Sequence, residues 1–203
     1  MSEENINLSI SGIINEKKEI PKEEYKNFDT MVQSYINETR GILTNIKING
    51  KEIPLNYYNE IKGAFFEGGE TVELEFSSKK DVLKDLITQG FEYIEKLEMN
   101  LENISKEVLM NTEEGHKMLN SIAEGFEALL NILSQVTKFT EDKLYTDEDL
   151  EKIKEVVTTI VKAQEDQDYL EVSDIIDFDL PEVIKIFEKG FKEADRILNE
   201  TSN

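Results

Sequence analysis

TEEGHKMLNSIAEGFEALLNILSQV, residues 112–136, is the stretch of this sequence that decides the fold. Thr112 is a residue type that caps helices, and two glutamates follow it in the first turn, where the helix dipole favours acids. Large apolar side chains then recur at alternating spacings of three and four residues, the period of one helix face. The stretch therefore predicts an amphipathic helix that packs against other helices through Leu119, Ile122, Phe126, Leu129, Leu133 and Val136.

The same spacing recurs on both sides of this stretch. Residues 83–108 carry a stripe close to a heptad, and Ser77 or Ser78 precedes it as a helix cap. Residues 150–160 and 184–198 carry two further stripes, the last one preceded by an early proline that suits a helix start. Three long helices and a shorter one, joined by short connections, predict an antiparallel bundle.

The number of helices in the predicted bundle depends on whether residues 147–178 form one helix or two. This region contains neither glycine nor proline, and Thr146 can cap its start, so we predict one long helix. A break near Asp166 is the alternative. Residues 79–203 form the predicted helical bundle domain in either case.

The first 78 residues follow the two-residue period of strands instead. Ile6, Leu8 and Ile10 alternate with polar residues, residues 16–20 return as a second strand, and residues 72–76 form the last one. Between them we predict a helix that enters at Pro21 and ends just before Gly41.

A hairpin and a short helix complete this region. Asn49-Gly50 is a strong tight-turn pair between two short strands, and residues 54–61 allow a helical turn. The resulting order of elements resembles the ubiquitin-type β-grasp fold, over residues 5–76 and in topology only. The predicted class is α+β, mostly α: a β-grasp-like domain of residues 1–78 followed by an antiparallel four-helix-type bundle.

Composition limits the classes of partner. The chain has 44 acids against 23 bases, and residues 79–203 account for −15 of the net charge of −21. Such a field repels nucleic acid and anionic membrane surfaces, so we expect neither as a partner. The chain has no cysteine, no signal-peptide pattern and no apolar run long enough to cross a bilayer, so we expect a cytoplasmic protein.

No motif names a reaction or a cofactor. Glu113 and His116 have the Glu-x-x-His spacing of carboxylate-bridged di-iron bundles, but those sites need a second histidine and His116 is the only one. Gly68-Gly69 is similar to the terminal glycine pair of ubiquitin-like modifiers and sulfur carriers, yet it is internal here and predicts a loop. We therefore predict no catalytic residue, no metal site and no cofactor.

The most unusual stretch is residues 165–182, which hold eight acids and no base. An EF-hand calcium loop is excluded, because its sixth position would be Glu171 rather than glycine. One interpretation is a solvated helix face. The functional interpretation is a docking surface for a basic, partly apolar protein segment. The predicted partner-binding residues are Asp168, Tyr169, Glu171, Asp174, Ile176, Asp177 and Phe178.

These observations favour a non-enzymatic interaction module, such as an adaptor, a chaperone-like factor or an assembly subunit. Small acidic helical chaperones of bacterial export systems are similar in composition. A carboxylate-based enzyme with a cleft between the two domains is the alternative, and an acidic mimic of nucleic acid is the third. A homodimer is left open, since the stripes do not show which seams are covered.

Overall fold

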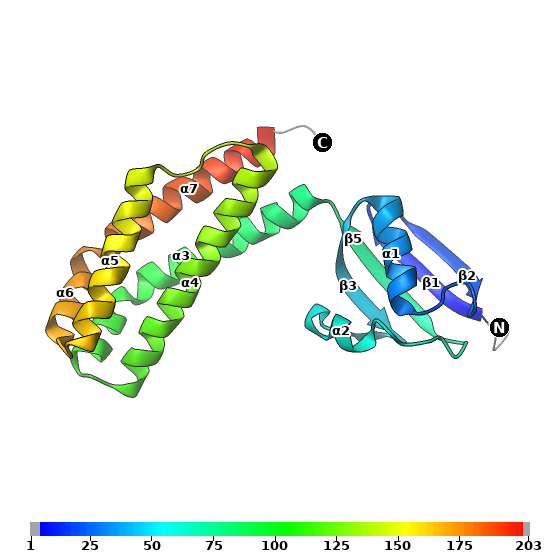
Figure 1. The fold of residues 1–203 in the computed structure, drawn as a ribbon, viewed down its shortest axis with the longest axis horizontal. Helices are drawn as coiled ribbons and strands as arrows, with labels where there is room; N and C mark the ends of the chain where they lie inside the picture. The colour runs from blue at the N-terminus through cyan, green and yellow to red at the C-terminus, as the bar shows by residue number, and fades with distance from the viewer. Residues whose placement is uncertain (1–4, 201–203) are drawn as a thin grey trace. The chain divides into compact units, whose positions relative to one another are not determined.

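The computed structural model describes residues 5–200. The chain divides into two compact units, Met1–Val82 and Leu83–Asn203 (Figure 1). The first unit is a five-stranded sheet with one main helix. The second consists of helices. The protein is thus α+β and mostly α, as predicted. We call the two parts the sheet unit and the helical unit.

The sheet has the β-grasp order β2-β1-β5-β3-β4. The first and last strands, β1 and β5, run parallel in its centre, and the other pairs are antiparallel. The buried residues of these strands alternate along the chain and line one face. The strands are β1 (Asn5–Gly12), β2 (Glu16–Pro21), β3 (Ile42–Ile48), β4 (Lys51–Glu52) and β5 (Thr71–Ser77).

Helix α1 (Phe28–Thr39) contributes to the core of the sheet unit, which also contains the buried strand residues. It begins later than predicted, because the Asn27 side chain accepts the Thr30 N–H and caps the helix there. Tyr25 precedes the helix. The left-handed residue that ends it is Arg40, with φ of 53°, rather than Gly41.

The hairpin between β3 and β4 turns at Asn49-Gly50, where both residues have positive φ, as the predicted tight turn requires. The predicted helical turn over residues 54–61 consists of a 3-10 turn, Leu55–Tyr57, and the short helix α2 (Tyr58–Ile61). Gly68-Gly69 lies in a loop, as predicted, and both glycines have positive φ.

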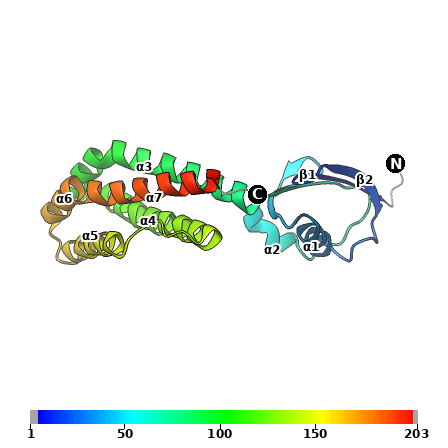
Figure 2. The ribbon, with the colours of Figure 1, turned by 90° about the horizontal axis from the view of Figure 1, so that it is seen from above.

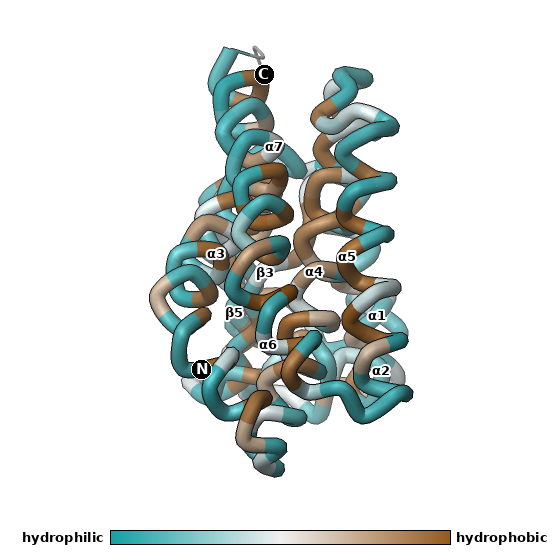
Figure 3. The backbone as a smooth tube through the Cα atoms, turned by 90° about the vertical axis from the view of Figure 1, so that its left-hand side faces the viewer, coloured by the Kyte–Doolittle hydropathy of each residue, from teal (hydrophilic) through white to brown (hydrophobic). Residues whose placement is uncertain are grey.

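Five helices form the helical unit (Figures 1 and 2). Most residues of the predicted stripes are buried in one continuous core. Leu101 and Val157 are only partly buried against that core, and Leu150 is half-buried outside it. Figure 3 shows hydrophobic stretches recurring along these helices between hydrophilic turns. The helices are α3 (Lys79–Leu109), α4 (Glu113–Thr140), α5 (Asp147–Glu165), α6 (Tyr169–Phe178) and α7 (Leu180–Glu200).

The predicted caps start three of these helices. Ser78 Oγ accepts the Asp81 N–H at 3.1 Å, and Thr112 Oγ1 accepts the Gly115 N–H at 3.0 Å. Thr146 and Asp149 form a reciprocal capping box at the start of α5. None of the described helices is long and apolar enough to cross a membrane.

The single helix predicted over residues 147–178 is wrong, and the alternative break is correct. Helix α5 ends at Glu165, and Gln167 takes a left-handed conformation with φ of 59°. Asp168 then caps α6, because its carboxylate accepts the Glu171 N–H at 3.0 Å. Asp168, one of the eight acids of residues 165–182, therefore caps the start of α6.

Helices α6 and α7 run antiparallel to α3. The buried hydroxyls of Ser105 on α3 and Ser173 on α6 are hydrogen-bonded at 2.8 Å. Further along the pair, the Phe191 ring of α7 lies against Gly90 and stacks edge-on with Phe91, with ring centroids 5.8 Å apart. Because residue numbers rise from 173 to 191 while they fall from 105 to 90, the directions are opposite.

Candidate functional site

The seven predicted partner-binding residues do not share one role. Asp168 is engaged as the cap of α6, and Ile176 is fully buried in the core of the helical unit. Tyr169 is half-buried and contacts the His116 ring edge-on, with centroids 5.5 Å apart. These three residues therefore position α6, although Asp168 itself is exposed.

The other four predicted residues face outward on α6. Glu171, Asp174, Asp177 and Phe178 are all exposed, and Phe178 keeps 74% of its surface accessible. Leu170, which is 61% exposed, lies on the same side one turn before Asp174. The outer side of α6 thus presents two large apolar side chains with three carboxylates and no base.

Helix α3 extends this surface. The α3 end is held beside the α6 start, since His116, which contacts Tyr169, is hydrogen-bonded to Asn111 at 2.8 Å. Two exposed apolar residues, Leu109 and Met110, lie at that end of α3. Figure 1 shows the α3–α4 and α5–α6 connections at the same end of the helical unit.

Met99, the most exposed large apolar residue at 78%, lies further back on α3. Successive residues of a helix are rotated by about 100° around its axis. Met99 therefore points about 120° away from the direction of Ser105 on α3, and Phe178 points about 140° away from that of Ser173 on α6. Both directions lead away from the core. Because the two helices are antiparallel, both side chains lie on the same outer side. We name this surface the α3–α6 face: Met99, Glu102, Lys106, Leu109, Met110, Leu170, Glu171, Asp174, Asp177 and Phe178.

Sequence reasoning found Phe178 but missed the other apolar residues of this face. Met99, Leu109, Met110 and Leu170 were absent from the predicted site, although each lies off the buried stripe of its region. That position was the available signal, because a large apolar residue outside a stripe has no core to enter. The pairing of α3 with α6, which brings these residues together, has no sequence signal.

A second surface lies in a groove of about 700 Å³ between α7 and the α4–α5 connection. Its walls carry five bases and three acids. Sequence reasoning missed it, although the four bases of α7 follow the spacing of a helix face. We name it the α7 groove; its lining is Lys143, Leu144, Tyr145, Thr146, Asp149, Lys185, Glu188, Lys189, Lys192, Glu193 and Arg196.

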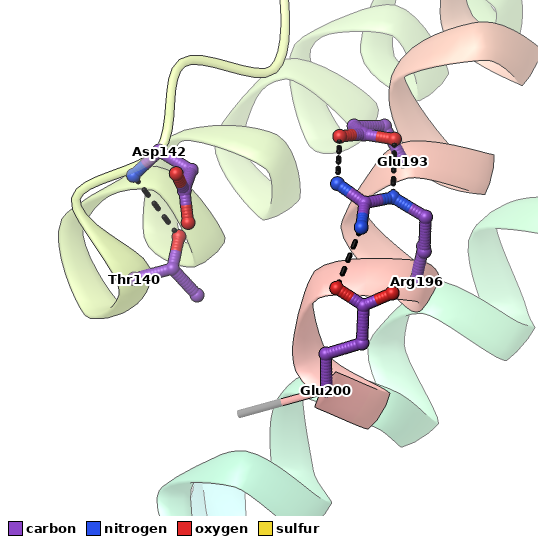
Figure 4. A network of polar contacts seen from close by, with 5 residues as sticks. All are labelled: Thr140, Asp142, Glu193, Arg196 and Glu200. Atoms are coloured by element: carbon purple, nitrogen blue, oxygen red, sulfur yellow. Dashed lines mark hydrogen bonds and ion pairs between the residues drawn. The ribbon is translucent and has the colours of Figure 1, made fainter. Parts of the chain in front are cut away.

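The charges of the α7 groove are paired with neighbours. Arg196 donates two hydrogen bonds to Glu193 and one to Glu200, as Figure 4 shows opposite Thr140 and Asp142 of the α4–α5 region. Lys192 pairs with Glu188 at 3.5 Å, and Lys189 with Asp149 at 3.9 Å. Ion pairs at the surface contribute little to stability, because water and salt screen them.

Hydrogen bonds shift several pKa values at this surface. The Thr146 backbone N–H lowers the pKa of Asp149, and the Arg196 guanidinium lowers that of Glu193. A lowered pKa keeps a carboxylate ionised at neutral pH, whereas a general acid requires a raised one. Asp149 and Glu193 therefore act as fixed charges in the groove rather than as carboxylic acids poised to protonate a substrate.

Metal binding has no support in the part of the chain that the structure describes, where no group of three or more histidine, aspartate or glutamate side chains is placed to hold an ion. His116, the histidine of the Glu-x-x-His spacing, is half-buried beside Tyr169 and Asn111. Its neighbours are an aromatic ring and an amide, so its role is packing between α4 and α6.

Comparison with known proteins gives a family match in the helical unit. A family model described as a domain of unknown function (DUF8042) matches residues 85–190, just over half of the chain. The matched residues run from α3 into α7 and lie within the helical unit. Neither the curated proteins nor the solved structures contain a match to the chain.

Proposed function

The chain belongs to the family of the domain of unknown function DUF8042, and we propose that its helical unit is a protein-interaction module. The α3–α6 face docks a basic, partly apolar segment of a partner protein. The observation that supports this most is the exposure of Met99, Leu170 and Phe178 beside carboxylates on two adjacent helices.

Exposed apolar side chains lower the solubility of a protein unless a binding partner covers them. Single surface apolar residues are ordinary, but a group of them rimmed by charge is typical of an interaction site. Five of the large apolar residues that are exposed in the helical unit belong to the α3–α6 face: Met99, Leu109, Met110, Leu170 and Phe178.

The charge of the face selects the partner. Glu102, Glu171, Asp174 and Asp177 outnumber the single base Lys106. Carboxylates around an apolar contact accelerate the encounter with a basic segment and reject an acidic one. The apolar side chains then supply the contact area, so the fitting partner is an amphipathic segment with lysine or arginine along its polar side.

The three carboxylates of α6 can make such a contact at low cost, because they lie on its exposed side and the cap of that helix is supplied by Asp168 instead. The absence of cysteine agrees with a reducing compartment, so the proposal includes a cytoplasmic location.

A binding experiment tests the α3–α6 face. A fluorescent peptide with lysine and leucine at helical spacing is titrated with the protein, and anisotropy reports the Kd. Changing Glu171→Gln, Asp174→Asn and Asp177→Asn together should weaken binding about tenfold, which corresponds to about 1.4 kcal/mol. Phe178→Ser should weaken it further at unchanged charge.

The matched control neutralises three exposed acids of α5 instead: Glu148→Gln, Glu151→Gln and Glu155→Gln. This control variant has the same net charge as the α6 triple variant. It should bind the peptide at least several-fold more tightly than the α6 triple variant does. Equal affinity of the two triple variants would show that net charge alone attracts the peptide, and the docking assignment would fail. Affinity capture from the native lysate with the same pair of variants then identifies the partner.

A further inference from the structure

We propose that the α7 groove is a second binding site, which accepts an acidic, partly apolar peptide segment of another protein. The site lies apart from the α3–α6 face and has the opposite preference in charge. Figure 1 shows the α4–α5 connection and the α6 helix at opposite ends of the helical unit. The inference does not depend on the function proposed for the α3–α6 face.

The bases of α7 form one continuous row. The helix has four bases, Lys185, Lys189, Lys192 and Arg196, and every one of them lines the groove. Their spacings of four, three and four residues keep them on one side of the helix. At 1.5 Å per residue the row is about 16 Å long, which suits an elongated ligand better than a single small anion.

The opposite wall adds a fifth base and apolar surface. Lys143 comes from the α4–α5 connection, together with the buried Leu144 and the half-buried Tyr145. The backbone of the connection approaches α7 closely at Gly190, where an added Cβ would lie 3.4 Å from the Leu144 carbonyl oxygen. A groove with an apolar base and charged edges suits a peptide that has both kinds of side chain.

The bases are available to a ligand. Their present partners are exposed or half-buried carboxylates, most of them one turn away on the same helix, and the four α7 bases are themselves exposed. Such pairs contribute little in water, so exchanging them for ligand carboxylates costs little. The gain comes from the ligand covering the charges, which strengthens the interaction. Five of the chain's 23 bases gather here although acids outnumber bases almost two to one.

The interleaved acids distinguish a peptide from other anions. Asp149, Glu188 and Glu193 also line the groove, so a uniform polyanion would meet repulsion along its length. The net charge of −21 repels nucleic acid and anionic lipid at longer range. A peptide of mixed side chains avoids both penalties, because its acids can be spaced to meet the bases.

The test uses the whole chain and a labelled 16-residue peptide in which glutamates recur every three or four residues with leucines between them. Fluorescence anisotropy at about 50 mM salt should show saturable binding, since the Debye length is then above 10 Å. Lys189→Glu combined with Lys192→Glu should weaken binding at least tenfold. The control Lys154→Glu with Lys162→Glu makes the same charge change on exposed α5 positions outside the groove and should weaken binding less than threefold.

Several results would overturn the proposal. The first is the absence of saturable binding up to about 1 mM peptide, and the second is equal weakening by both double variants. Tighter binding of a 16-nucleotide single strand or of vesicles containing phosphatidylserine, lost in the Lys189→Glu, Lys192→Glu variant, would assign the groove to a different anion. Self-association of the protein that this variant abolishes would make a second copy the occupant. Circular dichroism confirms that all variants keep the helical fold.

Discussion

The two units bury their apolar residues in different ways. In the sheet unit, Ile6, Leu8 and Ile10 enter the core, while the intervening Asn7, Ser9 and Ser11 lie on the other side of the sheet. That open side is polar across the strands, since Ser9 is paired with Lys17 on one neighbour and Glu73 on the other. The sheet unit exposes its large apolar residues at the start of β3, in the 3-10 turn and in connections: Ile13, Ile42, Leu55, Tyr57 and Phe65. The helical unit exposes most of its own on the helices of the α3–α6 face.

This difference shows where a functional signal lies. Where a strand alternates strictly, as β1 does, its open side carries polar residues only. The helices have complete buried stripes and also Met99, Leu170 and Phe178 outside them. Because those residues lie outside the buried core, we propose that the interaction surfaces belong to the helices.

The largest expected effect tests whether the two cores are separate. Phe126 is buried and lies 5.0 Å, centroid to centroid, from the Phe187 ring. Phe126→Ala should destabilise the helical unit by about 3–5 kcal/mol, through lost burial and the cavity left behind. Hydrogen exchange measured by mass spectrometry should show lower protection in α3–α7 and unchanged protection in β1, β3 and β5. Parallel loss in the strands would mean that residues 1–78 and 79–203 unfold together.

A smaller effect is expected where α3 meets α7. A Cβ at Gly90 would overlap the ring of Phe191. Gly90→Ala should therefore destabilise the helical unit by about 1–3 kcal/mol in a urea titration, despite the better helix propensity of alanine. The matched control is Gly63→Ala in the sheet unit, where the added Cβ has open space and the change should stay within about 0.5 kcal/mol. Equal effects would contradict the close packing of α3 on α7.

The capping box of α5 should contribute less to the stability of the helical unit than the packing of α3 on α7. Thr146→Ala removes the oxygen that accepts the Asp149 N–H at 3.0 Å, at an expected cost of about 1 kcal/mol. Thr158→Ala changes the same residue type at an exposed position inside α5 and should cost under about 0.5 kcal/mol. Thermal unfolding followed by circular dichroism distinguishes the two. A loss at Thr158 as large as at Thr146 would mean that the cap adds nothing.

The smallest effect is a dependence on pH from Asp149. Its pKa is lowered by the Thr146 backbone N–H, so the unfolded chain binds the proton first as pH falls. The stabilisation from this carboxylate is complete above the ordinary aspartate pKa of 3.8 and is lost as pH falls through the lower folded value. The melting temperatures of wild type and Asp149→Asn should therefore converge between pH 5 and pH 2. A constant difference would contradict the shift.

Local patterns predicted the elements well where one interaction decides them. Thr112 and Thr146 cap helices by bonds within four residues, and the stripe ending at Val136 has one side to bury. Strands β1, β2 and β5 alternate because each has one covered side. These signals lie in consecutive residues, so the sequence shows them directly.

Predictions failed where two local signals competed. Residues 165–168 contain no glycine or proline, yet Gln167 turns left-handed and Asp168 starts α6. Asn27 likewise delays the start of α1 beyond Pro21, and Arg40 replaces Gly41 as the left-handed residue. In each case a helix-compatible sequence also contained a good cap or an alternative end, and packing decided between them.

The sequence by itself determined the fold class, the buried stripes and the excess of acid, because periodicity and charge are properties of the chain that folding does not change. Only the tertiary structure decided which side of α6 faces solvent, that Ile176 is buried while Phe178 is exposed, and that α3 adds Met99 to the same face. It also decided that the bases of α7 meet Lys143 across a groove. Such surfaces join residues far apart along the chain, and no local pattern encodes which helices become neighbours.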